Sequence, residues 1–381
     1  WADEVKRIDN LGKISKQDVI EWACKYLADN NYAVVYKRQG EDRTVQKVSA
    51  PKITPIKSNR DVQSAFLAEI QAVEVEPIEP VYADFEKDMS IFNVKGVDVL
   101  YAQNKINDVT GITIEYNTGT ESDPALNLAF DYLSYLGTPT RSAEEIAQQM
   151  YQLACNFGLS SGSNRTFISI YGLSENMPEA MAIVEDLAYN AVPDEAILAN
   201  LKADMFKSRA DAKLNQGACF GQLQQYVLYG PEFIKKTTLT DKQIQSITSE
   251  ELLAKVRELL GCQHEIRYSG PASEKEVAKL IEENHIIAEN LKPLEKAYTR
   301  YLPVDASKVY LVQYDAKQIY YMQFSNRGET LDLKADPYVA LYNEYFGGGM
   351  NAIVFQEMRE ARGLAYSSSA RLYQPTHKDD S

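Results

Sequence analysis

An arginine and a tyrosine seven positions apart are the residues of this chain whose types and spacing point to chemistry. They are Arg359 and Tyr366, in the stretch "EYFGGGMNAIVFQEMREARGLAY" (344–366). Both side chains donate hydrogen bonds. The stretch predicts a glycine turn, a helix and the start of a strand, so we expect both side chains to project into a common space. The alternative is that Arg359 complements the helix dipole and Tyr366 packs on a sheet.

Other kinds of catalytic site find little support in the sequence. The three histidines, His264, His285 and His377, lie far apart without HxxH or HExxH spacing, and we interpret each as a surface residue. No GxSxG elbow is present, and "GGGMN" lacks both a clear preceding strand and the lysine of a phosphate loop. The four cysteines form no CxxC pair and are interpreted as buried small hydrophobic residues.

Composition limits the classes of protein that this chain can belong to. The 381 residues are 45% hydrophobic and 25% charged, which predicts two or three globular domains. A net charge of −14 argues against nucleic acid as a partner. No apolar run approaches the ~20 residues of a membrane span, so no membrane insertion is predicted. The chain begins at Trp1 without an initiator methionine, and we interpret it as a piece of a longer polypeptide.

Two pairs of similar segments indicate repeated domains. "ISKQDVIEWACKYL" (14–27) aligns without gaps to "ITSEELLAKVRELL" (247–260), and each predicts a helix followed by a strand, "YAVVYK" or "HEIRYSG". Residues 99–119 and 309–328 each predict a strand hairpin that ends in Asn and Gly. The first pair marks domain ends and the second pair marks domain starts. They alternate along the chain in the order end, start, end, start.

This order predicts one complete domain between two partial ones. The complete copy runs from strands through helices to further strands and a helix, which indicates an α+β fold. The segment between the first two units has four prolines and one short predicted helix, "VQSAFLAEIQAV", and is interpreted as a linker. The predicted boundaries are 1–50 for the tail of a preceding domain, 51–90 for the linker, 91–288 for the complete domain and 289–381 for the N-terminal part of a further domain.

Inside the complete domain, local signals predict where helices begin and end. "ALNLAFDYLSYLGT" (125–138) predicts a buried helix. Ser142 with Glu145 predicts a capping box at the start of the next helix, and Gly158 predicts its end.

The opening stretch resembles a specific family motif. "YFGGGMNAIVFQEMREARGLAY" resembles the segment of the pitrilysin or insulinase-like (M16) zinc metallopeptidases that carries their arginine and tyrosine pair. The repeats resemble the α+β domains of that family, each a mainly antiparallel sheet with helices packed on one face, and the resemblance covers essentially the whole chain. It implies four domains in two halves that close over a short or unfolded peptide. It also implies zinc bound in the first domain by HxxEH and a later glutamate.

Position by position, the resemblance assigns catalytic roles to Arg359 and Tyr366 and no metal ligand to this chain. In "NLAFDYLSYLGTPTRSAEEIA" the two histidine positions fall on Leu128 and Tyr132, and the catalytic glutamate position falls on Asp131. The later glutamate falls near residues 204–210. A leucine cannot bind zinc, and this departure matches the inactive third domain of the family. The chain is therefore expected to bind neither zinc nor another cofactor.

The resemblance implies that the chain is the non-zinc-binding half of a zinc endopeptidase, inactive alone. Its partners are a peptide or unfolded polypeptide substrate and an N-terminal half that carries the zinc. Arg359 and Tyr366 then stabilise the oxyanion formed when zinc-activated water attacks a peptide carbonyl. The alternative is a non-peptidase structural or peptide-binding subunit, similar to the core subunits of a respiratory complex. The family's habit suggests a bacterial periplasm or cell envelope, and the sequence does not identify the substrate.

Overall fold

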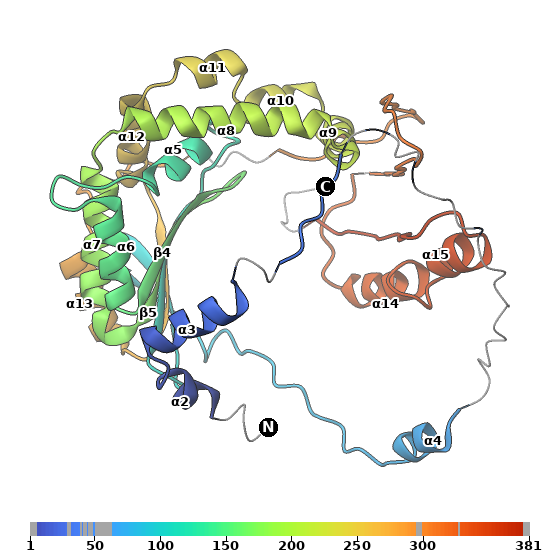
Figure 1. Ribbon diagram of the computed structural model, residues 1–381, viewed down its shortest axis with the longest axis horizontal. Coiled ribbons are helices and arrows are strands. Elements are labelled where there is room, and N and C mark those ends of the chain that lie inside the picture. Colours follow the sequence, from blue (N-terminus) through green and yellow to red (C-terminus); the bar gives the residue numbers. More distant parts are fainter. Residues whose placement is uncertain are drawn as a thin grey trace. The chain divides into compact units, whose positions relative to one another are not determined.

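The computed structural model describes most of the chain and divides it into two units. The described residues are 6–28, 32–38, 40, 44, 49, 63–294, 299–326 and 328–375. The first unit is Trp1–Glu79 and the second is Pro80–Ser381. The second unit holds all the strands of the described residues (Figure 1). The predicted domain boundary near residue 288 falls inside this unit and stays a prediction.

The first unit contains helices whose starts follow from local sequence signals. They are α2 (Arg7–Leu11), α3 (Lys16–Tyr26) and α4 (Ala65–Gln71). Ser15 and Asp18 form a capping box at the start of α3. The Ser64 side chain accepts a hydrogen bond from the Leu67 amide at the start of α4. The helices predicted in the first repeat and in the linker are therefore confirmed.

The strand predicted for "YAVVYK" is wrong in this structure. Residues 32–38 form no strand, and the Val35 side chain is 91% exposed. A strand persists where a neighbouring strand satisfies its backbone N–H and C=O groups, and the described part of the first unit holds no such neighbour. Residues 51–62 of the predicted linker lie outside the described residues.

The second unit is built on one six-stranded sheet. Its strands are β1 (Ser90–Val94), β2 (Val97–Gln103), β3 (Val109–Tyr116), β4 (Cys155–Ser161), β5 (Thr166–Leu173) and β6 (Glu265–Gly270). Their order is β1-β2-β6-β3-β5-β4, and β2 with β6 is the one parallel pair among them. The prediction of a mainly antiparallel sheet is confirmed.

The central place of β6 corrects the hairpin predicted at 99–119. Both strands of that segment form, but they do not pair with each other, because β6 lies between them. Tyr268 of β6 is opposite Tyr101 on β2 and opposite Ile112 on β3. Alternating apolar residues determine which face of a strand is buried, but they do not select its neighbour. A strand from much later in the chain therefore separates the two.

Helices cover one face of this sheet (Figure 1). These are α5 (Leu126–Leu133), α6 (Ala143–Gln152), α7 (Met177–Asn190), α12 (Ser249–Leu260) and α13 (Glu274–Asn284). The strand side chains that face them form the core: Val99, Ile114, Ile170 and Ile266 are each no more than 3% exposed. This arrangement confirms the α+β fold with helices on one face.

Further helices follow α7 in the chain and extend away from the sheet (Figure 1). They are α8 (Glu195–Lys213), α9 (Gln216–Tyr229), α10 (Pro231–Thr237) and α11 (Asp241–Ser246), and a short 3₁₀ turn, η1 (Ser174–Asn176), precedes α7. The α8 helix begins at Asp194, whose carboxylate accepts hydrogen bonds from the amides of Ala196 and Ile197.

The signals for helix ends were partly right. The capping boxes form where predicted, with Ser142 and Glu145 at α6 and with Thr248 and Glu251 at α12. The prediction that Gly158 ends the helix is wrong, because α6 ends earlier and Gly158 lies inside β4. The helix predicted at 125–138 is confirmed as α5, which is buried along most of its length.

The interpretation of the histidines as surface residues is wrong for two of them. His264 is 9% exposed and His285 is 7% exposed, and their Nε2 atoms lie 3.0 Å apart. The two residues are distant in sequence, but the packing of α13 against the sheet brings them together. His377 lies outside the described residues.

The second predicted hairpin, at 309–328, also does not form in this structure. Its described residues contain no strand and lie instead against α9. The Tyr310 ring centroid is 6.2 Å from that of Tyr226, and the Tyr320 ring centroid is 5.7 Å from that of Phe220. Aromatic contact with a helix thus replaces strand pairing for this segment.

The last described stretch has two helices and almost no buried residue. The helices are α14 (Asp336–Phe346) and α15 (Ile353–Phe355), and a π-helix, η2 (Gln356–Ala361), continues directly from α15. Among the described residues from 299 to 375, Gly347 and Ala352 are the buried ones. This stretch therefore lacks a hydrophobic core of its own.

Leu252 and Val19 occupy matching positions in the repeated helix sequences but have different surroundings. Leu252 on α12 is 0% exposed, and Val19 on α3 is 56% exposed. Leu252→Ala should lower the free energy of unfolding of the second unit by about 2–5 kcal/mol, because it leaves a cavity. Val19→Ala should change stability by less than about 0.5 kcal/mol. Denaturant titration measures both, and equal losses would contradict the difference in burial.

Candidate functional site

The segment that carries Arg359 and Tyr366 is anchored on α14. The Asn343 side chain on α14 donates to the Leu372 carbonyl oxygen at 2.9 Å and accepts from the Leu372 amide at 2.8 Å. The Gln374 side chain donates to the Asp336 carboxylate at 2.6 Å. These bonds hold the chain that follows the site alongside the helix that precedes it.

The glycine turn after α14 is needed for this close approach. A Cβ atom at Gly347 would lie 2.1 Å from the Ala370 carbonyl oxygen, so a larger residue there would push the two segments apart. The glycines thus allow the chain to turn between α14 and α15 while residues near 370 pack against the turn. The sequence predicted a glycine turn here, and that prediction is confirmed.

The predicted helix of the site is present in an altered form. It is a short α-helix, α15, followed by the wider π-helix η2, in which Arg359 lies in the last turn. The Leu364 amide donates to the Met358 carbonyl oxygen at 2.9 Å, which closes the helix end. Gly363 has φ of 59°, a left-handed conformation that glycine adopts without strain.

The strand predicted after this turn is wrong in this structure. Residues 364–373 form no strand, and the Tyr366 side chain is 86% exposed. The alternation of "LAYSSSARLY" is the right period for a strand, but no neighbouring strand lies beside it in the described residues. The alternative reading, that Tyr366 packs on a sheet, does not describe this arrangement. Arg359 does lie where it complements the helix dipole.

The structure brings Arg359 and Tyr366 into contact. The Arg359 guanidinium carbon lies 4.7 Å from the centroid of the Tyr366 ring and 4.7 Å from the centroid of the Phe355 ring. Its Nε atom is 3.7 Å from a carboxylate oxygen of Glu360. A guanidinium that stacks on an aromatic face still directs its N–H groups outward in its own plane, where they can donate hydrogen bonds. The arrangement therefore presents N–H and O–H donors side by side.

The positions that match the zinc motif do not fit zinc. Leu128 and Tyr132 on α5 are 3% and 0% exposed, while Asp131 on the same helix is exposed. The Tyr132 hydroxyl accepts from the Asp194 amide at 2.7 Å and donates to the Asp194 carbonyl oxygen at 3.1 Å. One of these positions thus holds a hydrocarbon, and the other supports the start of α8.

A hollow of about 370 Å³ lies between α5 and α8. Leu128, Met205 and Arg209 line it, where the resemblance would put zinc ligands. The Arg209 guanidinium is held by the Asp241 carboxylate and by the Leu239 carbonyl oxygen, at 2.5 Å from the latter. Across the described residues, no three His, Cys, Asp or Glu side chains converge to hold a metal ion.

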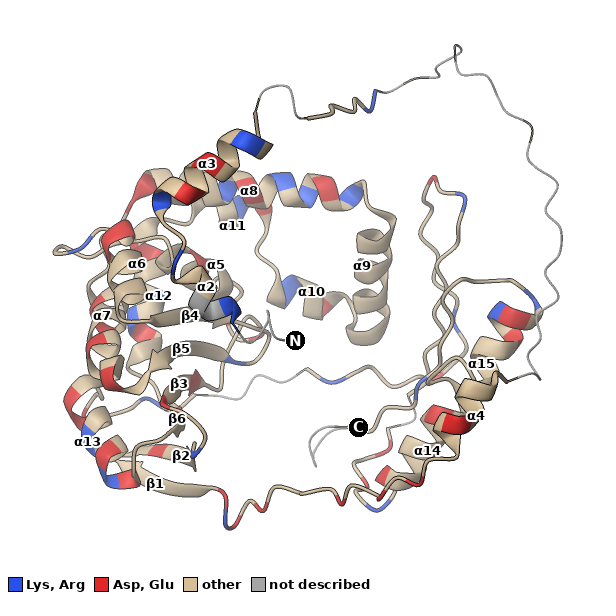
Figure 2. Ribbon diagram, turned by 60° about the horizontal axis from the view of Figure 1, so that its bottom comes forward, with Lys and Arg blue, Asp and Glu red and all other residues tan. Residues whose placement is uncertain are grey.

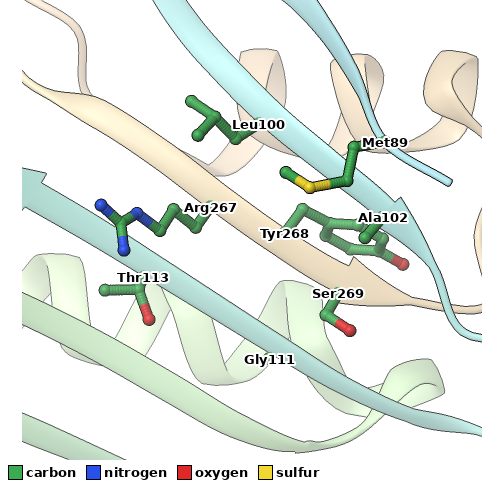
Figure 3. Close-up of a pocket in the computed structure, with 8 residues that line it drawn as sticks. All are labelled: Met89, Leu100, Ala102, Gly111, Thr113, Arg267, Tyr268 and Ser269. Carbon is green, nitrogen blue, oxygen red and sulfur yellow. The ribbon is translucent and has the colours of Figure 1, made fainter. Parts of the chain in front are cut away.

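A second hollow of about 370 Å³ lies on the face of the sheet opposite the helices, and sequence reasoning missed it. Figure 3 shows its lining side chains: Met89, Leu100, Ala102, Gly111, Thr113, Arg267, Tyr268 and Ser269. The small and polar residues at alternate strand positions were the available signal. Arg267 is ion-paired with the buried carboxylate of Glu115 at 2.6 Å, so its charge is already balanced.

Charged residues of both signs lie along α8. Figure 2 shows Lys and Arg alternating with Asp and Glu along α8. The described helices include none that is long and apolar enough to cross a bilayer.

Sequence comparison finds distant relatives among zinc proteases. No protein-family model matches the chain. It is 25% identical over 288 residues to an uncharacterized zinc protease of Rickettsia felis, which covers 72% of this chain and 65% of that protein. The match covers 57% and 56% of two further uncharacterized zinc proteases, from Rickettsia bellii and Streptomyces coelicolor. The chain therefore spans less than two thirds of these relatives.

Solved structures show the same fold. A peptidase M16 inactive domain from Pseudomonas fluorescens superposes with a TM-score of 0.58 at 20% identity, covering 73% of this chain and 69% of that one. The ferredoxin protease FusC, solved in complex with Arabidopsis ferredoxin, gives a TM-score of 0.51 at 11% identity, over 76% of this chain and 30% of that one. The chain is thus similar in sequence to zinc proteases and shares the fold of a peptidase M16 inactive domain.

Proposed function

We propose that this chain is the non-zinc-binding half of a zinc-dependent M16 endopeptidase, which binds peptide and contributes Arg359 and Tyr366 to peptide-bond hydrolysis. The observation that carries the proposal is the contact between these two residues, with 4.7 Å from guanidinium carbon to ring centroid. The relationship to zinc proteases supports the reaction class. Since Leu128 and Tyr132 do not fit zinc, the metal belongs to another part of the enzyme, the N-terminal M16 half.

The two donors suit the charge that develops during amide hydrolysis. The carbonyl oxygen of the peptide gains negative charge as the bond is attacked, and a phenol O–H and a guanidinium N–H can both donate to it. Tyr366 is largely exposed, so its hydroxyl can reach a bound peptide. Contact with the rings of Phe355 and Tyr366 limits the directions in which the N–H groups of Arg359 point.

The substrate class that we propose is supported by the same similarity to zinc proteases. A peptide or an unfolded polypeptide fits a protease of this family. The FusC complex with ferredoxin is an example of a similar fold crystallised with a protein. The partners that we propose are the polypeptide substrate and the zinc-bearing half, and the net charge of −14 argues against nucleic acid.

A non-peptidase structural or peptide-binding subunit is the second candidate. The buried, hydrogen-bonded Tyr132, at a position where an active domain needs a ligand, fits this candidate as well as the first. In such a protein the exposed Tyr366 hydroxyl has no reaction to assist. The two candidates therefore differ in what loss of that hydroxyl does.

The chain on its own should bind no stoichiometric zinc and cleave no peptide. Leu128 supplies no donor atom, and the Tyr132 hydroxyl already has two partners, so the family's ligand positions are lost. Elemental analysis after dialysis, with a fluorogenic peptide assay on the same sample, measures both properties. One tightly held zinc per chain would overturn the assignment to the non-zinc-binding half.

Tyr366→Phe, made in the enzyme with its zinc-bearing half, should lower kcat by roughly 10²-fold to 10³-fold, the range for loss of one oxyanion donor. The ring stays, so the melting temperature should not change. Tyr373→Phe is the matched control, because Tyr373 is also exposed and also carries an arginine, Arg371, over its ring at 5.3 Å. If Tyr366→Phe leaves kcat within about twofold, as Tyr373→Phe should, the catalytic role is wrong and the second candidate is favoured.

Arg359→Gln should raise KM and lower kcat together, because a charged donor beside the peptide acts both before and during attack. Arg371→Gln, which removes the other stacked arginine of the segment, should change neither by more than about twofold. Steady-state kinetics of the two variants separate a role of Arg359 toward the peptide from a general effect of charge. An unchanged KM and kcat in Arg359→Gln would contradict the role.

A further inference from the structure

A buried chain of three polar side chains joins elements that are far apart in sequence. Glu185 lies on α7, His285 ends α13, and His264 precedes β6. His285 Nδ1 is 2.5 Å from a Glu185 carboxylate oxygen, and His285 Nε2 is 3.0 Å from His264 Nε2. His264 Nδ1 is 2.8 Å from the Cys262 carbonyl oxygen. All three side chains belong to residues no more than 9% exposed.

The three hydrogen bonds that link these side chains and the Cys262 carbonyl oxygen need three protons. Two neutral histidines carry only two. The Cys262 carbonyl oxygen can only accept, so His264 Nδ1 carries a proton. His264 Nε2 then accepts from His285 Nε2, which also carries one. The remaining bond, between His285 Nδ1 and Glu185, needs a proton as well, and a neutral His285 has already used its own. Glu185 and His285 therefore share one extra proton.

The surrounding groups do not replace that proton. Tyr116 from β3 lies with its ring 5.1 Å from the His264 ring, and burial raises the pKa of its hydroxyl well above the ordinary value. Burial and the nearby Glu185 raise the pKa of Tyr189 on α7 to about 12. Burial raises the pKa of the Cys262 thiol. These groups are neutral at neutral pH and offer Glu185 no counter-charge.

Loss of the shared proton leaves a poorly satisfied carboxylate. The second carboxylate oxygen of Glu185 is buried without a hydrogen bond in the described structure. Lys292 and Glu258, which lie near Cys262, form an exposed ion pair at 4.0 Å. The charge of this lysine is therefore already balanced. Without the proton, two neutral rings can make only two of the three bonds of the chain. A buried carboxylate with unmade bonds is costly.

His285 also begins the segment by which the chain leaves α13. The Tyr189 hydroxyl donates to the Ile286 carbonyl oxygen at 3.2 Å. The Lys292 amide donates to the Gly261 carbonyl oxygen at 3.0 Å, and the Gln263 amide donates to the Lys292 carbonyl oxygen at 2.8 Å. The segment 285–292 is thus fixed at its start by the histidine and at its end by backbone bonds beside β6.

We propose that Glu185, His285 and His264 form a proton latch, in which one shared proton holds segment 285–292 on the domain at neutral pH and its loss at higher pH releases the segment. In the unfolded chain a histidine loses its proton near pH 6.5. Above that pH the folded state holds more protons than the unfolded state, so stability falls as pH rises.

Below pH 6.5, stability changes with pH in the opposite direction. Burial, together with the charge of His285, lowers the pKa of His264 to about 4, although its bond to the Cys262 carbonyl oxygen acts against this. Between pH 6.5 and about 4 the unfolded state takes up the additional proton, so stability falls as pH falls. The contribution of the latch to stability should therefore be greatest near pH 6.5.

The protonation states can be read by nitrogen NMR of selectively labelled histidine, since the chain has only three. At pH 7 we expect the His285 ring to carry protons on both nitrogens, with the Nδ1 proton held by this ring or shared with the Glu185 carboxylate. We expect the His264 ring to be protonated on Nδ1 alone. His377→Gln identifies the third signal. Two buried rings that each carry a single unshared proton at pH 7 would overturn the proposal.

Glu185→Gln tests the latch from the other direction. A glutamine amide can donate to His285 Nδ1, so all three bonds form with two neutral rings and no extra proton. Hydrogen exchange of the Lys292 amide, which donates to the Gly261 carbonyl oxygen, should lose about tenfold protection, corrected for the intrinsic rate, between pH 6.5 and 9 in the unmodified chain, the effect of one buried hydrogen bond. It should lose none in Glu185→Gln.

Tyr189→Phe is the matched control, because it removes a hydrogen bond to the same segment without changing the number of protons in the latch. It should lower protection equally at both pH values and keep the tenfold pH effect. Protection that is independent of pH in the unmodified chain, or a pH effect that persists in Glu185→Gln, would overturn the proposal. The nitrogen spectrum of the unmodified chain decides the question if a variant fails to fold.

Discussion

The insertion of β6 between β2 and β3 is the interaction on which the rest of the second unit depends. Tyr268 and Ile266 of β6 are opposite residues of β3, and β6 also pairs in parallel with β2. This strand follows the intervening helices in the sequence, so the centre of the sheet is made of contacts distant in sequence. Such contacts join residues from β1 to α13 in one sheet and its helical layer, which hold both the buried histidines and the sheet hollow.

Local signals in the sequence were enough for helices but not for strand pairing. Ser142 with Glu145 and Thr248 with Glu251 satisfy backbone groups within a few residues, so the predicted helix starts were confirmed. A strand needs a partner whose identity its own alternation does not contain. "YAVVYK" and residues 309–326 have the pattern of strands but no partner in the described residues, and they form none. The repeats thus predicted which types of element to expect, but they did not predict whether each copy forms them.

The same distinction decides what could be predicted about sites. The exclusion of zinc followed from side-chain chemistry alone, because Leu128 has no donor atom, and the structure adds that Tyr132 instead supports the start of α8. His264 and His285 could not be recognised as buried partners, since the helix α13 and the strand β6 that bring them together are placed by tertiary packing. Whether a polar side chain is buried depends on the fold, whereas whether a side chain can bind zinc depends on its own donor atoms.

Arg359 and Tyr366 were predictable as neighbours because their contact is local. The π-helix, the closure of Leu364 onto Met358 and the left-handed Gly363 bring them together within one turn of chain. Yet their segment buries only Gly347 and Ala352, so the local geometry sets the distance between the donors without fixing their position relative to a peptide. Transition-state stabilisation needs donors held within a fraction of an ångström. If the pair acts as proposed, that precision comes from packing around α14 and α15 in the complete enzyme, and the pair and its scaffold are then separable parts of the site.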